Sequence, residues 1–317
     1  TPPSCTATGV TSSSPVGSYP TACSGAVDGN YQISYVPGSL SVGPATPSVS
    51  INNLPATGIT GSSFTPDYTT SGDGTVFDVT VSPAAVCSAS PSGSVEFLTA
   101  GTCTLTPSVA ATNNYTQATG TPVQVTVDAP ATITSPATAY LPWLRSGSFT
   151  ITTAGTPTAT VTETGTLPYG LTFTPGPDGT ATITGTAGLF SFGTHTVTIT
   201  ATNGVGTPAV QTLTVVVGFA PVLAAPTSAH LAVGHRGDIG FVAFGYPVPS
   251  LAVTGALPVG MSFVDNGNGT ATLAGTPATA STGVYNVEVT ATNPYGTSTR
   301  TVTIDVNGPR HPAPKRR

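Results

Sequence analysis

The chain of 317 residues is long enough for several domains, each with its own hydrophobic core, and it carries a formal net charge of −5. Charged residues make up only 6% of it, against roughly 25% in a typical soluble domain, so hydroxyl side chains must supply most of the polar surface. Before position 310 the basic residues are Arg145, Arg236 and Arg300, too few to neutralise phosphates on one face, which excludes nucleic acid as a partner.

The four cysteines fall into two local pairs near the start of the chain. Cys5 and Cys23 lie in the first segment, and Cys87 and Cys103 lie in the second, with no CxxC or Cys/His spacing typical of zinc sites. An even, locally paired set in a chain rich in Thr and Gly predicts two disulfides, and hence an oxidising, extracellular or cell-surface location. The alternative is four buried thiols.

Two stretches resemble signals for attachment to a cell envelope. LPATG at residues 54–58 matches the LPxTG pentapeptide cut by sortases, but sorting requires that signal near the C-terminus, and about 260 residues follow it here. We therefore expect NLPATG to form the first strand of a β domain and its turn. Residues 215–234 lack a full charge and have the length of a membrane helix, but they contain two prolines and cross a repeat boundary. No transmembrane segment is expected.

A unit of about ninety residues occurs twice in the second half of the chain. TLPYGLTFTPGPDGTATITGT, which begins at Thr166, recurs as ALPVGMSFVDNGNGTATLAGT, which begins at Ala256. ITATNGVGT at Ile199 recurs with the same offset as VTATNPYGT at Val289. This self-similarity indicates two copies of one structural module.

Each copy has the pattern of a β-sandwich. Polar or hydroxyl residues alternate with Val, Ile or Leu in HTVTITA (195–201), QTLTVVV (211–217), YNVEVTA (285–291) and TVTIDV (301–306). This period of two predicts strands with one buried face, and no segment has the 3.6-residue period of a helix. Gly, Asn, Asp and Pro between these segments are typical turn residues. About seven short strands in ninety residues is typical of an immunoglobulin-like sandwich.

These motifs carry a family resemblance. GALPxGxxF, NGTATLxGTP, GxYxVxVTATNxxG and a closing TVTV-like strand resemble the Ig-like, cadherin-like repeats of large bacterial surface proteins. Upstream, INNLPATGITGSSFTPDYTTSGDGT, SVEFLTAGTCTLT and NNYTQATG resemble a bacterial Ig-like repeat in which two cysteines staple a hairpin. The opening GSYPTACSGAVDGNYQISYVPGSLSV resembles the second half of an MBG-type β module.

The resemblance implies an all-β fold class, a beads-on-a-string rod of tandem immunoglobulin-like, cadherin-like β-sandwiches. Short linkers that contain proline, such as GPATP at Gly43 and GFAP at Gly218, are expected to join the modules. The expected domains are a partial MBG-type module (1–46), a bacterial Ig-like sandwich (47–128), two Ig/cadherin-like sandwiches (129–218 and 219–307) and a basic disordered tail (308–317).

Repeats of this kind imply a non-catalytic, extracellular structural or adhesive stalk of a bacterial surface or secreted protein. Such a stalk spaces a functional head or mediates weak multivalent adhesion. The alternative is an accessory carbohydrate-binding or spacer region of a larger secreted enzyme. The expected partners are other domains of the parent protein and a glycan or protein ligand on a cell surface.

The resemblance makes calcium the cofactor to consider, because cadherin-type folds often bind it through clusters of carboxylates. The turns at Asp178 and at Asp265, Asn266 and Asn268 come nearest to such a cluster, but each has one carboxylate, and no DxD, DxNDN or LDRE run is present. The backbone angles of a tight turn account for DNGNG. No cofactor is expected, and calcium at these turns is the alternative.

The sequence contains no recognisable catalytic motif. No histidine lies in a motif with a Ser or Cys nucleophile, and the twelve acidic residues are scattered, unlike the paired carboxylates of a glycosidase. No enzymatic activity is expected. Candidates for an aromatic platform that binds sugar are Trp143, Tyr140, Tyr169, Phe190 and Phe192. Trp143 is the candidate ligand contact among them, and core or interdomain packing is the other interpretation of this residue.

Overall fold

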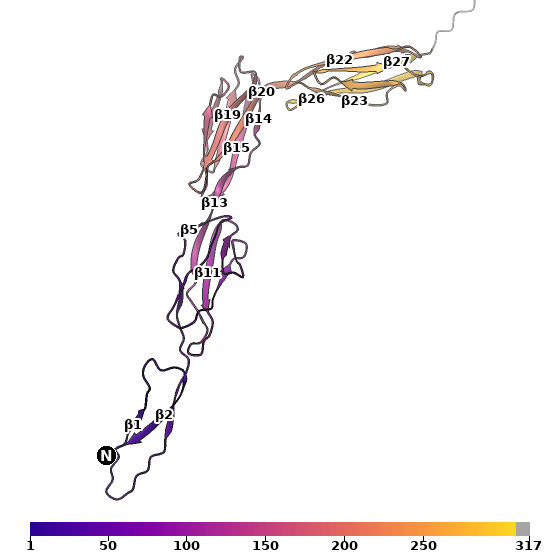
Figure 1. Cartoon of the computed structure of the whole chain (residues 1–317). Coiled ribbons are helices and arrows are strands. Elements are labelled where there is room, and N and C mark those ends of the chain that lie inside the picture. The colour runs from indigo at the N-terminus through magenta and orange to yellow at the C-terminus, as the bar shows by residue number, and fades with distance from the viewer. Residues whose placement is uncertain (309–317) are drawn as a thin grey trace, which may run out of the picture. The chain divides into compact units, whose positions relative to one another are not determined.

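The computed structural model describes residues 1–308, which consist largely of β-strands (Figure 1). Within that range there is no α-helix, and a 3-10 turn, η1 (Thr279–Ser281), precedes one of the last strands. The predicted all-β fold class is confirmed. Of the tail predicted at residues 308–317, only Gly308 is among the described residues. Contacts divide the chain into two compact units: Thr1–Pro130 with Gly155–Pro157 and Gly204–Gly206, and Ala131–Ala154 with Thr158–Asn203 and the chain from Thr207 onward.

The first unit begins with a small antiparallel sheet of β1 (Ser4–Ala7), β2 (Gly17–Ser24) and β3 (Gly38–Val42). Cys5 lies directly opposite Cys23 in this sheet, and the two form one of the expected disulfides. No residue before Pro47 is buried. The covalent bond therefore holds together strands that have no hydrophobic core of their own.

The rest of the first unit is a sandwich whose core surrounds the second disulfide. Cys87 and Cys103 are bonded and have no exposed surface, and they pack among Val95, Phe97 and Leu105. The strands are β4 (Val49–Ile51), β5 (Thr57–Ile59), β6 (Ser63–Phe64), β7 (Tyr68–Thr70), β8 (Phe77–Ser82), β9 (Cys87–Ala89), β10 (Val95–Phe97), β11 (Gly101–Val109), β12 (Ala118–Thr119) and β13 (Val123–Ile133).

NLPATG at residues 53–58 differs from its expected structure, because it connects two strands rather than forming the first one. Strand β4 ends before it, and its last two residues begin β5, which pairs in parallel with β13. Asn53 holds the connection by donating to the carbonyl of Thr65 at 2.8 Å and accepting from the amide of Asp67 at 2.7 Å. Pro55 has no amide hydrogen and cannot donate a backbone hydrogen bond to a neighbouring strand, which favours a connecting segment at this point.

The second unit contains two β-sandwiches with the same strand arrangement. In the first, one sheet has the order β14-β20-β19-β16, and β15, β18 and β17 form the other face. These strands are β14 (Thr138–Pro142), β15 (Ser146–Thr156), β16 (Thr160–Gly165), β17 (Leu171–Pro175), β18 (Thr180–Thr186), β19 (Gly193–Thr202) and β20 (Ala209–Ala224). The predicted strands at 195–201 and 211–217 lie within β19 and β20.

The second sandwich repeats this topology strand by strand. One sheet has the order β21-β27-β26-β23, with β21 parallel to β27 as β14 is to β20, and β22, β25 and β24 form the other face. The strands are β21 (Ser228–Ala232), β22 (Gly237–Tyr246), β23 (Ser250–Thr254), β24 (Met261–Asp265), β25 (Thr270–Gly275), β26 (Gly283–Asn293) and β27 (Gly296–Asn307). The predicted strands at 285–291 and 301–306 lie within β26 and β27.

Each sandwich of the second unit has its own core, and the period of two in the sequence accounts for it. Val197 and Ile199 on β19 point inward, as do Val287 and Val289 on β26, and the residues between them lie toward solvent. Full burial of one such side chain stabilises the fold by about 1.5–3 kcal/mol. Further core residues are Leu141, Ile151, Ile183, Leu213 and Val215 in the first sandwich, and Phe241, Leu251, Leu273, Val302 and Ile304 in the second.

The segment GFAP, residues 218–221, where the sequence predicts a short linker, lies within strand β20 at the point where its pairing passes from one sandwich to the next. The strand continues through this segment and pairs with β19 and then with β22. Its register with β22 shifts between Phe219 and Val222, so Pro221 lies at an irregularity where the missing amide hydrogen costs little. Gly and Pro thus accompany a bulge within a continuous strand.

The LPxG motif of both copies has a steric cause. Gly170 has φ +90°, and a Cβ atom there would lie 2.1 Å from the carbonyl oxygen of Thr186; Gly260 has φ +93°, and its Cβ atom would lie 2.2 Å from the carbonyl oxygen of Thr276. A side chain would collide with the backbone at either position, so glycine is required. The preceding residue, Tyr169 or Val259, is thereby presented at the surface.

Candidate functional site

The most exposed large apolar side chains of the second unit border a concavity in its first sandwich. Tyr169 is 86% exposed and Phe190 is 95% exposed. The concavity has a volume of about 680 Å³, within the range of roughly 300–1,000 Å³ typical of small-ligand sites. We call it the aromatic concavity; its lining residues are Thr166, Leu167, Pro168, Tyr169, Leu189, Phe190, Ser191 and His195.

Hydrogen bonds to the main chain tie together the two loops that line the aromatic concavity. The carbonyl oxygen of Tyr169, in the β16–β17 loop, accepts from the amide of Gly188 at 2.8 Å and from the hydroxyl of Ser191 at 2.9 Å, both in the β18–β19 loop. A ring nitrogen of His195, Nε2, lies 3.0 Å from the carbonyl oxygen of Ser191. Ser191 is buried, so these bonds are shielded from water and hold the loops in place.

A second support comes from the turn between β14 and β15. Trp143 Nε1 donates to the carbonyl oxygen of Leu189 at 3.2 Å, and the amide of Leu144 donates to that of Ala187 at 3.2 Å. Leu144 has φ 56°, and no other non-glycine residue within 1–308 has a positive φ. The equivalent residue of the second copy is Gly234, with φ 74°. The first copy therefore carries a strained leucine beside the loop that displays Phe190.

The lining of the aromatic concavity is uncharged but not wholly apolar. None of its residues is Asp, Glu, Lys or Arg. Three of the lining residues, Thr166, Tyr169 and His195, also carry polar groups, and the two hydroxyls and Nδ1 of the imidazole have no hydrogen-bond partner within residues 1–308. The site thus combines aromatic walls with a few free donors and acceptors, which is the usual make-up of a ligand pocket.

The second sandwich keeps the frame of this site and lacks its aromatic lining. The amide of Ala278 donates to the carbonyl oxygen of Val259 at 2.9 Å, as Gly188 does to Tyr169 in the first copy. The hydroxyl of Tyr285 donates to the carbonyl oxygen of Ser281 at 3.1 Å, in the position of His195. Where the first copy has Tyr169, Leu189 and Phe190, the second has Val259, Thr279 and Ala280.

The five aromatic candidates from the sequence separate into two groups. Tyr169 and Phe190 line the concavity. Trp143 is half-buried, with its ring centre 5.8 Å from that of Phe192 and 6.1 Å from that of Phe219, and Tyr140 packs edge-on against Tyr295. A direct ligand contact by Trp143 stays a prediction, since its observed contacts are internal. Sequence reasoning did not select Leu189 or Thr166, whose local sequence has no distinguishing signal.

Tyr295, another residue that sequence reasoning missed, lies where the two sandwiches of the second unit meet. Its hydroxyl oxygen lies 2.6 Å from the carbonyl oxygen of Val216 and 3.1 Å from that of Leu141, and burial raises its pKa to about 12. Asn293 donates to the carbonyls of Phe219 and Pro247 beside it. The available signal was the difference between the copies, because VTATNPYGT has Tyr where ITATNGVGT has Val.

Two of the calcium candidates, Asp265 and Asn268, use their side-chain oxygens for hydrogen bonds within the second sandwich. Asp265 accepts from the amides of Leu251 at 2.9 Å and Gly267 at 3.0 Å, and Asn268 accepts from the amide and hydroxyl of Thr270. Asn266 donates to the hydroxyl of Thr270 at 2.9 Å. Asp178 is exposed in the corresponding turn of the first copy. Among residues 1–308, no group of three or more His, Cys, Asp or Glu side chains could hold a metal ion.

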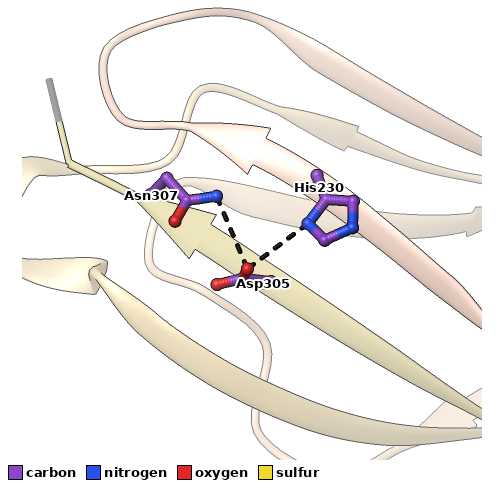
Figure 2. A network of polar contacts seen from close by, with 3 residues as sticks. All are labelled: His230, Asp305 and Asn307. Carbon is purple, nitrogen blue, oxygen red and sulfur yellow. Dashed lines mark hydrogen bonds and ion pairs between the residues drawn. The ribbon is translucent and has the colours of Figure 1, made fainter. Parts of the chain in front are cut away.

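A small polar network joins the neighbouring strands β21 and β27 (Figure 2). Nδ1 of His230 lies 3.3 Å from Oδ2 of Asp305, and Asn307 donates to the same oxygen at 3.5 Å. The His230 side chain is 73% exposed. An ion pair this open to water contributes about 0–1 kcal/mol. His230 and Asn307 also border a shallow pocket, together with Val233 and His235. This network links two strands without forming a reaction centre.

Comparison with known families identifies two parts of the chain. Residues 225–307 match the family described as Putative Ig domain, and residues 2–41 match the MBG domain (YGX type). The resemblances stated for these two segments are confirmed. No curated protein matches the chain. No helix in the described part of the chain is long and apolar enough to span a membrane.

Similar solved structures include tandem immunoglobulin domains. An I-band fragment of titin is 13% identical, with 83% of this chain and 99% of that chain covered and a TM-score of 0.34. Extracellular domains 3–5 of Drosophila OTK are 17% identical, with coverages of 84% and 100% and a TM-score of 0.46. An endo-fucoidan hydrolase of glycoside hydrolase family 107 is 15% identical, with coverages of 84% and 45% and a TM-score of 0.26. Likenesses at this level concern the fold alone.

Proposed function

We propose that this chain is a non-catalytic segment of a bacterial surface or secreted protein, in which tandem Ig-like sandwiches space a functional part from its attachment and support weak, multivalent adhesion. The observation that carries this proposal is that each sandwich of the second unit closes a hydrophobic core of its own. A chain built from self-contained modules gains length with each copy, and its stability is nearly the sum of its parts.

The chemistry of the chain supports an extracellular location. Both disulfides join cysteines that are close in sequence, and the described residues contain no free cysteine. Such bonds persist in oxidising compartments. The near absence of Lys and Arg leaves few sites for trypsin-like proteases, which suits an exposed protein.

The spacer role is tested by removing modules one at a time. Small-angle scattering would measure the maximum dimension of the full chain and of a variant that ends after Ala224, and calorimetry would follow their unfolding. We expect the shorter chain to lose one thermal transition and to become shorter by about one sandwich, while the transition of the remaining sandwich of the second unit falls only by the contribution of its lost contact with Tyr295. Loss of all transitions, or an unchanged maximum dimension, would contradict independent modules.

A second candidate function is favoured by one observation, the aromatic concavity. The two most exposed aromatic rings of the second unit border this pocket, and exposed apolar surface gathered beside a pocket is typical of a binding site. In this alternative the chain is an accessory carbohydrate-binding region of a larger secreted enzyme. A hydrolase domain elsewhere in the parent open reading frame would support it, and a parent made only of repeats would support the stalk.

A further inference from the structure

We propose that the aromatic concavity of the first sandwich in the second unit binds neutral polysaccharide, with Tyr169 and Phe190 stacking on the apolar faces of successive sugar rings. The proposal deepens the second candidate function and rests on it. It does not depend on the spacer role, which concerns the cores of the modules rather than this surface.

Folding of the sandwich does not require these aromatic side chains. The second sandwich has the same loops and the same supporting main-chain hydrogen bond, with Val259, Thr279 and Ala280 at the equivalent positions. Tyr169 and Phe190 bury little of their own surface, so they contribute little hydrophobic stabilisation. Their presence in one copy alone therefore points to a role in binding.

Hydrogen bonds fix the backbone of the two loops that carry these rings. The carbonyl oxygen of Tyr169 receives two hydrogen bonds from the opposite loop, and the carbonyl oxygen of Leu189 receives one from Trp143 Nε1. A preorganised pair of loops loses little conformational entropy when a ligand binds. In this arrangement Trp143 is a positioning residue for the loop that displays Phe190.

The residues that line the concavity indicate the chemistry of its ligand. The concavity has no Asp, Glu, Lys or Arg side chain that could pair with a charged ligand, so a neutral ligand is the best match for its electrostatics. Its aromatic walls suit the C–H faces of pyranose rings, and the free groups of Thr166, Tyr169 and His195 can exchange hydrogen bonds with sugar hydroxyls. An apolar side chain of a protein would bury those three groups without partners, which is unfavourable.

The test uses the full chain and a panel of named polymers. Affinity electrophoresis would be run in gels that contain soluble starch, β-1,3-glucan, galactomannan or xyloglucan, with polygalacturonate as the anionic comparison. We expect retardation by at least one neutral polymer and none by polygalacturonate. The triple variant Tyr169→Val, Leu189→Thr, Phe190→Ala installs the side chains of the second copy and should weaken binding tenfold or more.

Two further variants keep the test decisive. Phe190→Ala alone changes a side chain that is 95% exposed, so it leaves folding intact, and it should weaken binding several-fold. Phe244→Ala removes an exposed aromatic ring from strand β22 and should leave the affinity unchanged. Equal retardation of the wild-type and triple-variant chains would overturn the proposal.

Absence of retardation by every neutral polymer would also overturn the proposal, as would binding to polygalacturonate alone. Capture of a cell-surface protein that is abolished by the triple variant, without any binding to the polymers, would assign the surface to a protein partner instead. None of these results bears on the spacer role, because the truncated chain in the scattering experiment measures that role separately.

Discussion

The hydroxyl group of Tyr295 lies 2.6 Å from the carbonyl oxygen of Val216 and so connects the β26–β27 turn to strand β20. The same hydroxyl oxygen lies 3.1 Å from the carbonyl oxygen of Leu141, on β14. One residue of the second sandwich thus contacts two neighbouring strands of the first. Modules with separate cores are held together here by a specific, partly buried polar contact.

Removing this hydroxyl should loosen the contact between the two sandwiches. Tyr295→Phe keeps the ring and leaves two half-buried carbonyl groups without that donor, so we expect the free energy of unfolding of the second unit to fall by about 1–2 kcal/mol. Denaturant titration would measure it. Tyr140→Phe is the matched control, because its ring packs against Tyr295 while its hydroxyl has no hydrogen-bond partner within residues 1–308. An equal loss in both variants would contradict a specific role for the Tyr295 hydroxyl.

Alkaline pH should weaken the same contact. Burial raises the pKa of Tyr295 from its ordinary value of 10.0 to about 12. Below pH 10 the hydroxyl is protonated in both the folded and unfolded chain, and its contribution to stability is fully present. Between pH 10 and 12 the unfolded chain releases this proton while the folded chain retains it, so stability falls as the pH rises and the contribution is lost above 12.

The alkaline effect can be isolated by comparing the wild-type chain with Tyr295→Phe. Burial, followed by the charge of Asp78, also raises the pKa of Tyr68, and this contribution is common to both proteins. We expect the difference in unfolding free energy between the two proteins to shrink from pH 10 to pH 12. The difference in their tyrosinate absorbance should titrate near pH 12. A difference that titrates at pH 10 would show a solvated hydroxyl.

The two disulfides should differ in what they stabilise. Cys87 and Cys103 lie in a hydrophobic core and close a loop with a sequence separation of 16, so replacing both with Ala should destabilise that sandwich by about 3 kcal/mol. Replacing Cys5 and Cys23 should free a sheet that has no buried residues, without moving the thermal transition of the sandwich. Calorimetry with limited proteolysis would separate the effects. Equal shifts of that transition by both changes would contradict this assignment.

The DNGNG turn should behave as a structural turn rather than a calcium site. Asp265 accepts hydrogen bonds from two backbone amides, so Asp265→Ala should lower the unfolding free energy by about 1–3 kcal/mol. EDTA and millimolar calcium should leave the melting temperature of the wild-type chain unchanged. A rise in melting temperature with calcium that Asp265→Ala abolishes would restore the calcium interpretation.

The sequence predicted the strands of the second unit well, because their faces differ sharply in polarity. HTVTITA and YNVEVTA place Val197, Ile199, Val287 and Val289 in the cores, as the period of two requires. Prediction failed where Gly and Pro had two possible roles. At residues 218–221 they accompany a bulge within β20, and at residues 53–58 they accompany a connection rather than a strand. Local residue preferences cannot distinguish these cases, since pairing with a distant strand decides them.

The sequence predicted only part of the aromatic concavity, because the contacts of a side chain also depend on distant parts of the chain. The five candidates are all aromatic, and only their packing in the folded chain separates Tyr169 and Phe190, which line the concavity, from Trp143, Tyr140 and Phe192, which contact other rings. The difference between the two copies was a usable signal, because a shared frame with different side chains shows which positions the fold leaves free. The same comparison distinguishes Tyr295 from Val205 and Leu144 from Gly234.

Leu144 provides a direct test of that comparison, because it occupies a backbone conformation that suits glycine. A left-handed conformation costs a residue with a side chain about 1–2 kcal/mol. Replacement by glycine removes this cost, but it also stabilises the unfolded chain by about 0.4–1 kcal/mol because glycine has greater conformational freedom. Leu144→Gly should therefore raise the free energy of unfolding by up to about 1 kcal/mol, as measured by denaturant titration.

The reciprocal change in the second copy isolates the backbone contribution. A Cβ atom at Gly234 would meet nothing within 4 Å, so Gly234→Ala should destabilise its sandwich by about 1 kcal/mol through conformation alone. If Leu144→Gly instead lowers stability, contacts of the half-exposed leucine side chain outweigh the strain. If Leu144→Gly raises stability and also weakens polysaccharide retention, the strained turn positions the loop that carries Phe190. The link between them is the hydrogen bond that the amide of Leu144 donates to the carbonyl oxygen of Ala187, at the start of that loop.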